Sequence, residues 1–253
     1  MFNDAAQSRK NDIDIEQMID QNDFYHVVQP IIRLQDKRII GFEALLRSDR
    51  EQKTDKLFSQ ASSQGQLFNI DTISLYRAME TFEYASSNFQ LDTKLFLNVF
   101  PSTLLHSDFS AFMQTALNRF SIKRNQIVIE LNETYDEELL RNIDLLCDKI
   151  DLCRSWGFLI ALDDVGVGAA DIKKMIEFAP DFIKLDRYFS ENLAQLEKKQ
   201  MLLNLMVQFC SGDSSLILEG IEREEDMLTA QKLGIEYGQG YYLGYPECPL
   251  GER

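Results

Sequence analysis

The sequence predicts an α/β protein whose strands close into a barrel. Short runs rich in β-branched and aromatic residues alternate with longer segments of helical periodicity, the pattern of strands covered by helices. Eight runs qualify as strands: 24–34, 38–46, 95–99, 127–131, 158–164, 182–186, 216–221 and 237–243. Eight strands that alternate with helices predict a TIM-like (β/α)8 barrel.

The segments between these strands predict helices, most clearly at 69–87, 137–157, 190–210 and 222–234. The link between the first two strands is different, because only "QDK" separates them. A crossover helix takes a dozen or more residues. We therefore expect the first two strands to be antiparallel, which makes the barrel irregular.

Nothing in the composition divides the chain, since it has no Pro-rich or Ser-rich linker and no repeat of fixed period. We expect three segments. Residues 1–21 form a polar lead-in that can be helical through "DIEQMID", residues 22–246 form the barrel, and residues 247–253 form a C-terminal tail.

Composition limits the classes of function. A formal net charge of −15 argues against binding a nucleic-acid polymer through its phosphates, and an anionic substrate would need local positive charge such as metal ions. No run approaches the ~18 apolar residues that span a bilayer, and the charged N-terminus is unlike a signal peptide. Four cysteines without a CxxC pair suit a reducing compartment. We therefore expect a cytoplasmic protein.

Almost every predicted strand carries one polar residue near its C-terminal end, although burial of such a residue is unfavourable unless it is paired or bound to metal. These residues are Glu43, Asn98, Glu130, Asp163, Asp164, Lys184, Glu219 and Gln239. In a β/α barrel the strand ends converge on the rim where active sites form. A ring of carboxylates repels itself unless cations lie within it.

Oxygen ligands favour Mg²⁺ or Mn²⁺, whereas zinc usually recruits His or Cys. His26 and His106 lie in no zinc-binding motif, and we interpret them as surface or hydrogen-bonded histidines. The adjacent acids Asp163 and Asp164 can bridge two ions ~3.5–4 Å apart, as in hydrolysis of phosphate esters. Singly, each acid is more often an edge residue or a helix cap. Lys184 is either a partner of the acids or a group that orients water, and we favour the second role.

These residues resemble the EAL domain, a bacterial phosphodiesterase that opens cyclic di-GMP to linear pGpG. The resemblance covers about residues 22–246, and its segments occur in family order. They are "FEALLR", "LNVFPSTL", "IELNE", "LDDVGVG", "DFIKLDR", "LEGIE" and "QGYYLGYP". It implies two Mg²⁺ or Mn²⁺ ions that activate water for in-line attack on phosphorus. It also implies a homodimer and leaves room for a regulatory protein that the residues do not identify.

The resemblance also implies roles for individual residues. The metal ligands are Glu43, Asn98, Glu130, Asp163, Asp164 and Glu219, with Asp163 shared between the ions. Lys184, Glu219 and Glu43 are the catalytic residues, and Lys184 holds the attacking water. The substrate-binding set is Arg47, Gln29, Gln239, Glu222 and Asp186, in which Arg47 meets a phosphate and Gln239 also orders the site. Glu133 stabilises the loop after the Asp pair.

The chain departs from the family pattern after the Asp pair, where hydroxyl residues are replaced within Val165–Gly168 and at Ala169 and Ala170. Ser48 also replaces the usual Trp. These changes leave open the rate, the metal affinity and dimerisation. The main alternative is therefore a weak or inactive EAL domain that acts as a cyclic di-GMP receptor or protein-interaction module. A dinucleotide site at "GVGAAD" is disfavoured, because the third glycine is missing and the acids before it repel a pyrophosphate.

Overall fold

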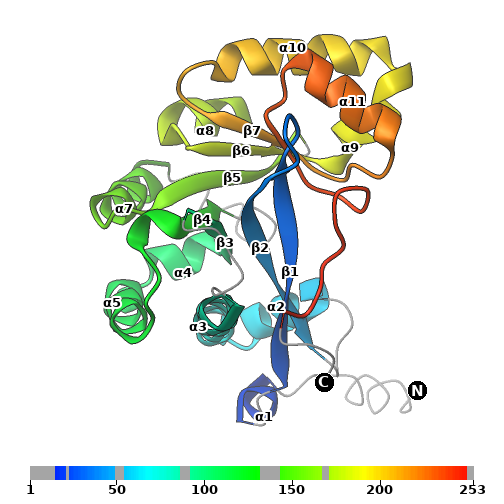
Figure 1. The fold of residues 1–253 in the computed structure, drawn as a ribbon. Coiled ribbons are helices and arrows are strands. Elements are labelled where there is room, and N and C mark those ends of the chain that lie inside the picture. Colours follow the sequence, from blue (N-terminus) through cyan, green and yellow to red (C-terminus); the bar gives the residue numbers. More distant parts are fainter. Residues whose placement is uncertain are drawn as a thin grey trace, which may run out of the picture.

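The computed structural model describes residues 15–20, 23–48, 54–85, 92–131, 143–166 and 171–249. Its strands form a closed barrel in the order β1 to β8 (Figure 1). Strand β1 is antiparallel to both β2 and β8, and all other pairs are parallel. The strands are β1 Phe24–Arg33, β2 Ile39–Ser48, β3 Lys94–Val99, β4 Ile127–Leu131, β5 Leu159–Val165, β6 Phe182–Leu185, β7 Ser215–Leu218 and β8 Tyr237–Gly238. The predicted TIM-like barrel with an antiparallel first pair is confirmed.

Helices cover the outside of the barrel (Figure 1). The α-helices are α1 Ile15–Asp20, α2 Thr54–Ser63, α3 Leu67–Ala85, α4 Pro101–Leu105, α5 Phe109–Arg119, α7 Ile143–Ser155, α8 Asp171–Phe178, α9 Arg187–Ser190, α10 Glu197–Cys210 and α11 Glu224–Leu233. Two 3₁₀ turns, η3 Arg124–Gln126 and η4 Leu193–Gln195, complete the set. Helix α7 lies within the predicted helix 137–157, whose first residues fall outside the described ranges.

Three predicted elements are clearly shorter in the structure: the predicted strand 216–221 ends at Leu218, and two others are shortened where a residue turns the backbone. The predicted helix 190–210 is divided into η4 and α10, and Asn192 before η4 has a left-handed φ of 56°. The predicted strand 237–243 ends at Gly238, because Gly240 has φ +151° and passes close to Ile221. A Cβ at Gly240 would lie 2.2 Å from the Ile221 nitrogen, so only glycine fits this turn.

The barrel interior has an apolar layer beneath the polar residues named above. Ile31, Phe96, Val128, Ala161, Phe182 and Ile217 form this layer and are buried. Successive inward-facing residues of a strand are two positions apart. The next inward-facing residue along each strand is therefore polar: Asn98 after Phe96, Glu130 after Val128, and Lys184 after Phe182. The same strands therefore supply the packed floor and the polar layer above it.

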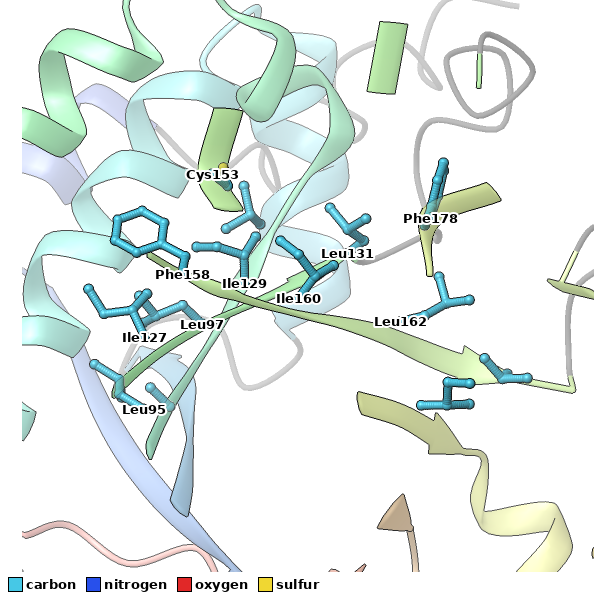
Figure 2. Packing of buried hydrophobic residues seen from close by; sticks show 14 of the residues in the cluster. Leu95, Leu97, Ile127, Ile129, Leu131, Cys153, Phe158, Ile160, Leu162 and Phe178 are labelled. Carbon is cyan, nitrogen blue, oxygen red and sulfur yellow. The ribbon is translucent and has the colours of Figure 1, made fainter. Parts of the chain in front are cut away.

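The outward-facing residues of the strands pack against the helices in a second apolar layer (Figure 2). Figure 2 shows Ile129 and Ile160 close to Cys153 of α7, with Phe158 beside them. A smaller cluster joins α1 to the barrel, where Ile15 and Met18 pack with Phe24 and Leu46. The predicted helix in the lead-in is therefore present, and the three-segment division of the chain stays a prediction. None of the helices within the described ranges could cross a bilayer.

Asp71 is a buried acid on α3 that holds the turn after β3. Its carboxylate accepts a hydrogen bond of 3.1 Å from the Phe100 backbone nitrogen. Burial raises the pKa of Asp71 from 3.8 to about 7, and the polar groups of Thr103 and Phe100 offset only part of the shift. The folded protein therefore binds a proton at Asp71 that the unfolded chain releases near pH 4.

We predict that Asp71→Asn makes stability less sensitive to pH. Because the folded pKa is raised, the contribution of Asp71 is complete below pH 3.8 and is lost as the pH rises to about 7. Between pH 5 and pH 8 the variant should gain ~2–3 kcal/mol in unfolding free energy relative to the parent. Urea unfolding at the two pH values measures this gain. If the unfolding free energies of the variant and the parent differed by the same amount at pH 5 and at pH 8, the raised pKa of Asp71 would be contradicted.

Candidate metal centre and active site

The polar residues of the inner layer meet at one end of the barrel. Asn98 and Glu130 are penultimate residues of neighbouring strands β3 and β4 and face each other in register. Glu219 and Gln239 follow directly after β7 and β8. Glu43 lies in β2 opposite Gln29 of β1. Residues from all eight strands are therefore brought to one site.

Lys184 stands at the centre of this site with its side chain buried. Its Nζ lies 3.2 Å from Glu43 Oε2, 3.0 Å from Glu130 Oε1, 2.9 Å from Asp163 Oδ1 and 2.9 Å from Glu219 Oε1. One ammonium thus contacts four carboxylates. Burial opposes the charge on Lys184, but the four carboxylates outweigh it and raise the pKa well above its usual value.

Two amide side chains hold the carboxylates in place. Asn98 Nδ2 donates to Glu43 Oε1 at 3.0 Å and to Glu130 Oε2 at 3.1 Å. Gln239 Nε2 donates to Glu43 Oε2 at 2.7 Å and to Gln29 Oε1 at 3.1 Å. Burial raises the pKa of Glu43, yet Lys184 and these amide donors outweigh it and lower the pKa overall. Glu43 is therefore an ionised carboxylate of fixed orientation.

A local irregularity in β5 lets two adjacent acids face one site. Adjacent strand residues normally point to opposite faces. Here the register with β6 shifts between Leu162 and Val165, and Asp164 has a left-handed φ of 53°. Asp163 and Asp164 consequently each place a carboxylate oxygen within 4.8 Å of one from Glu219. The strand irregularity is what makes the acid pair usable as ligands.

The remaining carboxylates resist ionisation because they are buried together. Burial raises the pKa of Glu130 and Asp163, and Lys184 offsets only part of this effect. Burial, with the neighbouring acids, raises the pKa of Asp164 to about 6 and that of Glu219 to about 8. Such carboxylates have a strong electrostatic preference for additional positive charge.

The residues fit divalent cations. Carboxylate oxygens of Glu43, Glu130 and Asp163 lie within 4.8 Å of one another, and a second such group shares Asp163. Glu130 Oε1 and Asp163 Oδ1 are buried without a well-formed hydrogen bond and are held by the charge of Lys184 alone. If ionised, five carboxylates beside one ammonium leave an excess negative charge equal to two divalent ions. The all-oxygen donor set suits Mg²⁺, Mn²⁺ or Ca²⁺.

Two cavities flank this centre. A cavity of about 260 Å³ is lined by Arg47 together with Asn98 and Asp163. The second, also about 260 Å³, is lined by the other substrate-binding candidates, Gln29, Asp186, Glu222 and Gln239. Asp186 also caps α9, because its Oδ1 accepts the Tyr188 backbone N–H at 2.8 Å. The substrate-binding roles of these residues stay predictions.

Some predicted features lie elsewhere. Glu133 and residues 167–170 fall outside the described ranges. His26 Nε2 is 3.1 Å from Ser74 Oγ, and burial lowers the pKa of His26 to about 3. His106 stacks on Phe68 at a centroid distance of 3.8 Å. Both histidines thus have structural contacts.

Sequence reasoning missed three residues near the site: Asp71, Arg187 and Tyr241. Asp71 lines the Arg47 cavity, and Arg187 and Tyr241 line the second one. For Asp71 a signal existed, because it falls on the buried face of α3 with Ile70 and Leu75. Arg187 begins the four-residue helix α9 and Tyr241 lies in a turn, and both stretches are too short for periodicity to show which side chains face a cavity.

A family model described as EAL domain matches residues 13–246. The chain belongs to the EAL domain family of cyclic di-GMP phosphodiesterases. A relative from Escherichia coli K12, the probable cyclic di-GMP phosphodiesterase PdeA, is 25% identical over 94% of this chain and 32% of its own length. The blue light- and temperature-regulated antirepressor BluF of that organism is 24% identical over 86% of this chain and 52% of its own. This EAL chain spans about a third of the first relatives that it matches.

Solved structures of EAL proteins share the fold. The EAL enzyme Bd1971, in a form bound to cAMP and cyclic di-GMP, superposes with a TM-score of 0.86 at 24% identity, over 97% of this chain and 68% of that one. Klebsiella pneumoniae BlrP1, in a complex with manganese and cyclic di-GMP, superposes with a TM-score of 0.77 at 23% identity, over 90% and 57% of the two chains.

We predict that Lys184→Met destabilises the metal-free protein. Removal of one partner from a buried ion pair costs ~3–5 kcal/mol, because the other charge remains buried. In EDTA the unfolding free energy should fall by about that amount, and Mn²⁺ should restore more of it in the variant than in the parent. Urea unfolding with and without Mn²⁺ measures both effects. The control is Lys232→Met on the exposed face of α11. An unchanged unfolding curve in EDTA would show that the carboxylates do not depend on this ammonium.

Proposed function

We propose that this chain hydrolyses cyclic di-GMP to linear pGpG with two divalent cations. The observation that supports it most directly is that two clusters of three carboxylates lie beside Lys184 and have Asp163 in common. The clusters are Glu43, Glu130 and Asp163, and Asp163, Asp164 and Glu219. Two bound divalent cations would supply an activated water and would stabilise charge on the attacking and leaving oxygens of the phosphodiester. Mg²⁺ and Mn²⁺ are the proposed cofactors, and the manganese complex of BlrP1 supports this choice.

The residues of the chain have distinct proposed roles. The metal ligands are Glu43, Asn98, Glu130, Asp163, Asp164 and Glu219. Asn98 and Gln239 keep Glu43 ionised and fixed. Lys184 neutralises part of the carboxylate charge, and its ammonium orients water and offsets charge on the phosphate oxygens. Arg47, in the adjoining cavity, binds a phosphate, for which a guanidinium is well shaped.

We predict that Asp163→Asn removes most activity. Asp163 belongs to both carboxylate clusters, so its loss should weaken the binding of both ions and lower kcat at least roughly 10²-fold. Formation of pGpG from cyclic di-GMP with Mn²⁺, followed by chromatography, measures this. Asp144→Asn on the exposed face of α7 is the matched control and should keep full activity. Turnover by Asp163→Asn at the rate of the parent would exclude the two-ion site.

The alternative is a cyclic di-GMP receptor or protein-interaction module with little turnover. The altered loop after Asp164 and the antirepressor BluF among the relatives support it. Retention of all six proposed ligands and Lys184 favours the enzyme. Binding of cyclic di-GMP without formation of pGpG, in Mg²⁺ and in Mn²⁺, would establish the receptor instead.

We also propose that two copies of the chain associate through α8 and α10. Exposed apolar side chains lie in rows on these helices: Ile172 and Ile176 on α8, and Met201, Leu205 and Phe209 on α10. The two helices connect β5 to β6 and β6 to β7, so they cover neighbouring strands. Apolar rows of this kind are typical of surfaces that become covered. The cytoplasmic location stays a prediction.

We predict that Ile176→Glu and Leu205→Glu shift the chain from dimer to monomer. Each places a charge in an apolar contact, where burial of an unpaired charge is unfavourable. Light scattering coupled to size-exclusion chromatography measures the mass. Leu145→Glu, at an exposed apolar position of α7, is the control and should remain dimeric. A monomeric parent at tens of micromolar, or dimeric variants, would contradict the proposed surface.

A further inference from the structure

A pair of stacked tyrosines includes one residue, Tyr241, that lines the second cavity. Tyr241 and Tyr245 lie in the segment after β8, with ring centroids 4.7 Å apart and ring planes at 19°. The two residues are 52% and 61% exposed, so neither ring belongs to the core. Tyr241 lines the cavity together with Asp164 and Glu219 of the metal centre. An exposed aromatic ring therefore lies in the cavity of the proposed reaction centre, and a second exposed ring stacks on it.

The segment that carries the tyrosines is tied to the metal centre by a chain of hydrogen bonds. Gln29 Nε2 donates to the Gly244 carbonyl oxygen at 3.1 Å. Gln29 Oε1 in turn accepts from Gln239 Nε2, which also donates to Glu43 Oε2. The backbone next to Tyr245 is thus connected to a proposed metal ligand through two buried amides. The tyrosine pair is positioned by the same side chains that position Glu43.

Backbone contacts fix the segment further. The Tyr242 nitrogen donates to the Ile221 carbonyl oxygen at 3.0 Å. Val28 and Glu247 exchange two backbone hydrogen bonds, of 2.8 and 3.0 Å, which attach the chain beyond Tyr245 to β1. Gly244 packs so closely that a Cβ there would lie 2.4 Å from Pro30 Cγ. In Figure 1 the red segment after β8 runs beside β1. The rings are therefore held before any ligand arrives, which reduces the entropy lost on binding.

We propose that Tyr241 and Tyr245 form a stacking platform for one base of a cyclic purine dinucleotide. This inference rests on the proposed function and adds a base-binding subsite to it. A nucleobase offers a flat π-face that stacks on aromatic side chains. Arg187, the one Lys or Arg among the described residues that line this cavity with Tyr241, pairs with Glu222 at an Nη2–Oε1 distance of 3.7 Å. A phosphodiester held at the metal centre would leave its attached base free to reach the tyrosines.

The first test measures affinity for cyclic di-GMP by titration calorimetry with Ca²⁺. Tyr241→Ala, Tyr245→Ala and the double variant are compared with the parent. Loss of one base stack should weaken binding roughly 5- to 150-fold. Tyr241→Phe and Tyr245→Phe keep the ring and should bind within about twofold of the parent. Tyr84→Ala, an exposed tyrosine of α3, is the matched control.

The second test reports stacking directly. The probe is a cyclic dinucleotide in which 2-aminopurine replaces one guanine, because its fluorescence is quenched when the base stacks. The parent and the Phe variants should quench it, whereas the double Ala variant should not when both proteins are saturated. Circular dichroism melts and Mn²⁺ stabilisation confirm that each variant is folded. If the double variant is unfolded, the Tyr241→Ala variant decides the outcome, because Tyr241 is the ring that lines the cavity.

The outcomes separate this inference from the proposed function. A folded parent that neither binds nor hydrolyses cyclic di-GMP overturns the proposed function. A parent that binds it, with unchanged affinity and quenching in the Ala variants, overturns the platform alone. Tyr241→Ala and Tyr245→Ala that keep nucleotide affinity but change the oligomeric mass would assign the pair to a protein contact and likewise overturn the platform.

Discussion

The structure depends on a balance between one buried ammonium and the carboxylates that surround it. Lys184 could not remain charged inside the barrel without Glu43, Glu130, Asp163 and Glu219, and these acids could not be gathered there without positive charge. The members come from different strands, so the balance exists only when the barrel is closed. Fold and site are therefore coupled through electrostatics as well as through packing.

Because inward-facing residues recur every second position, each of these strands supplies one residue to the apolar layer that stabilises the barrel and another to the polar site. Phe96, Val128 and Phe182 pack the floor, and the next inward residue of each strand is polar. The floor excludes water from beneath the site, which strengthens the charge interactions above it. Asp164 is the exception, since an ideal strand would point it away from Asp163. Because its backbone is left-handed, Asp164 can face the same site as Asp163, so two successive residues of one strand can both serve as ligands.

The strands and their inward polar residues could be predicted, because an acid or Lys within a short apolar run can be recognised from the sequence alone. Glu130 in "IVIEL" and Lys184 in "FIKLD" are examples. The break at Asn192 and the end of β8 at Gly238 could not be predicted, since each depends on a backbone conformation in a turn. Tyr241 was likewise missed, because its place at the cavity is set by contacts of the turn with Ile221 and Gln29.

An acidic chain is a physically reasonable host for an anionic ligand when its charges are arranged in this way. The carboxylates are concentrated at the centre, where bound divalent cations would reverse the local sign of the potential. Arg47 and Arg187 lie in the two cavities on either side of Glu43. A dianionic ligand would therefore meet the cations at the middle and one guanidinium in each cavity, although the whole chain carries −15 and Arg187 is paired with Glu222. Charge alone does not distinguish one anion from another, so selectivity must depend on the other groups that line the cavities. In one cavity these include the stacked ring of Tyr241.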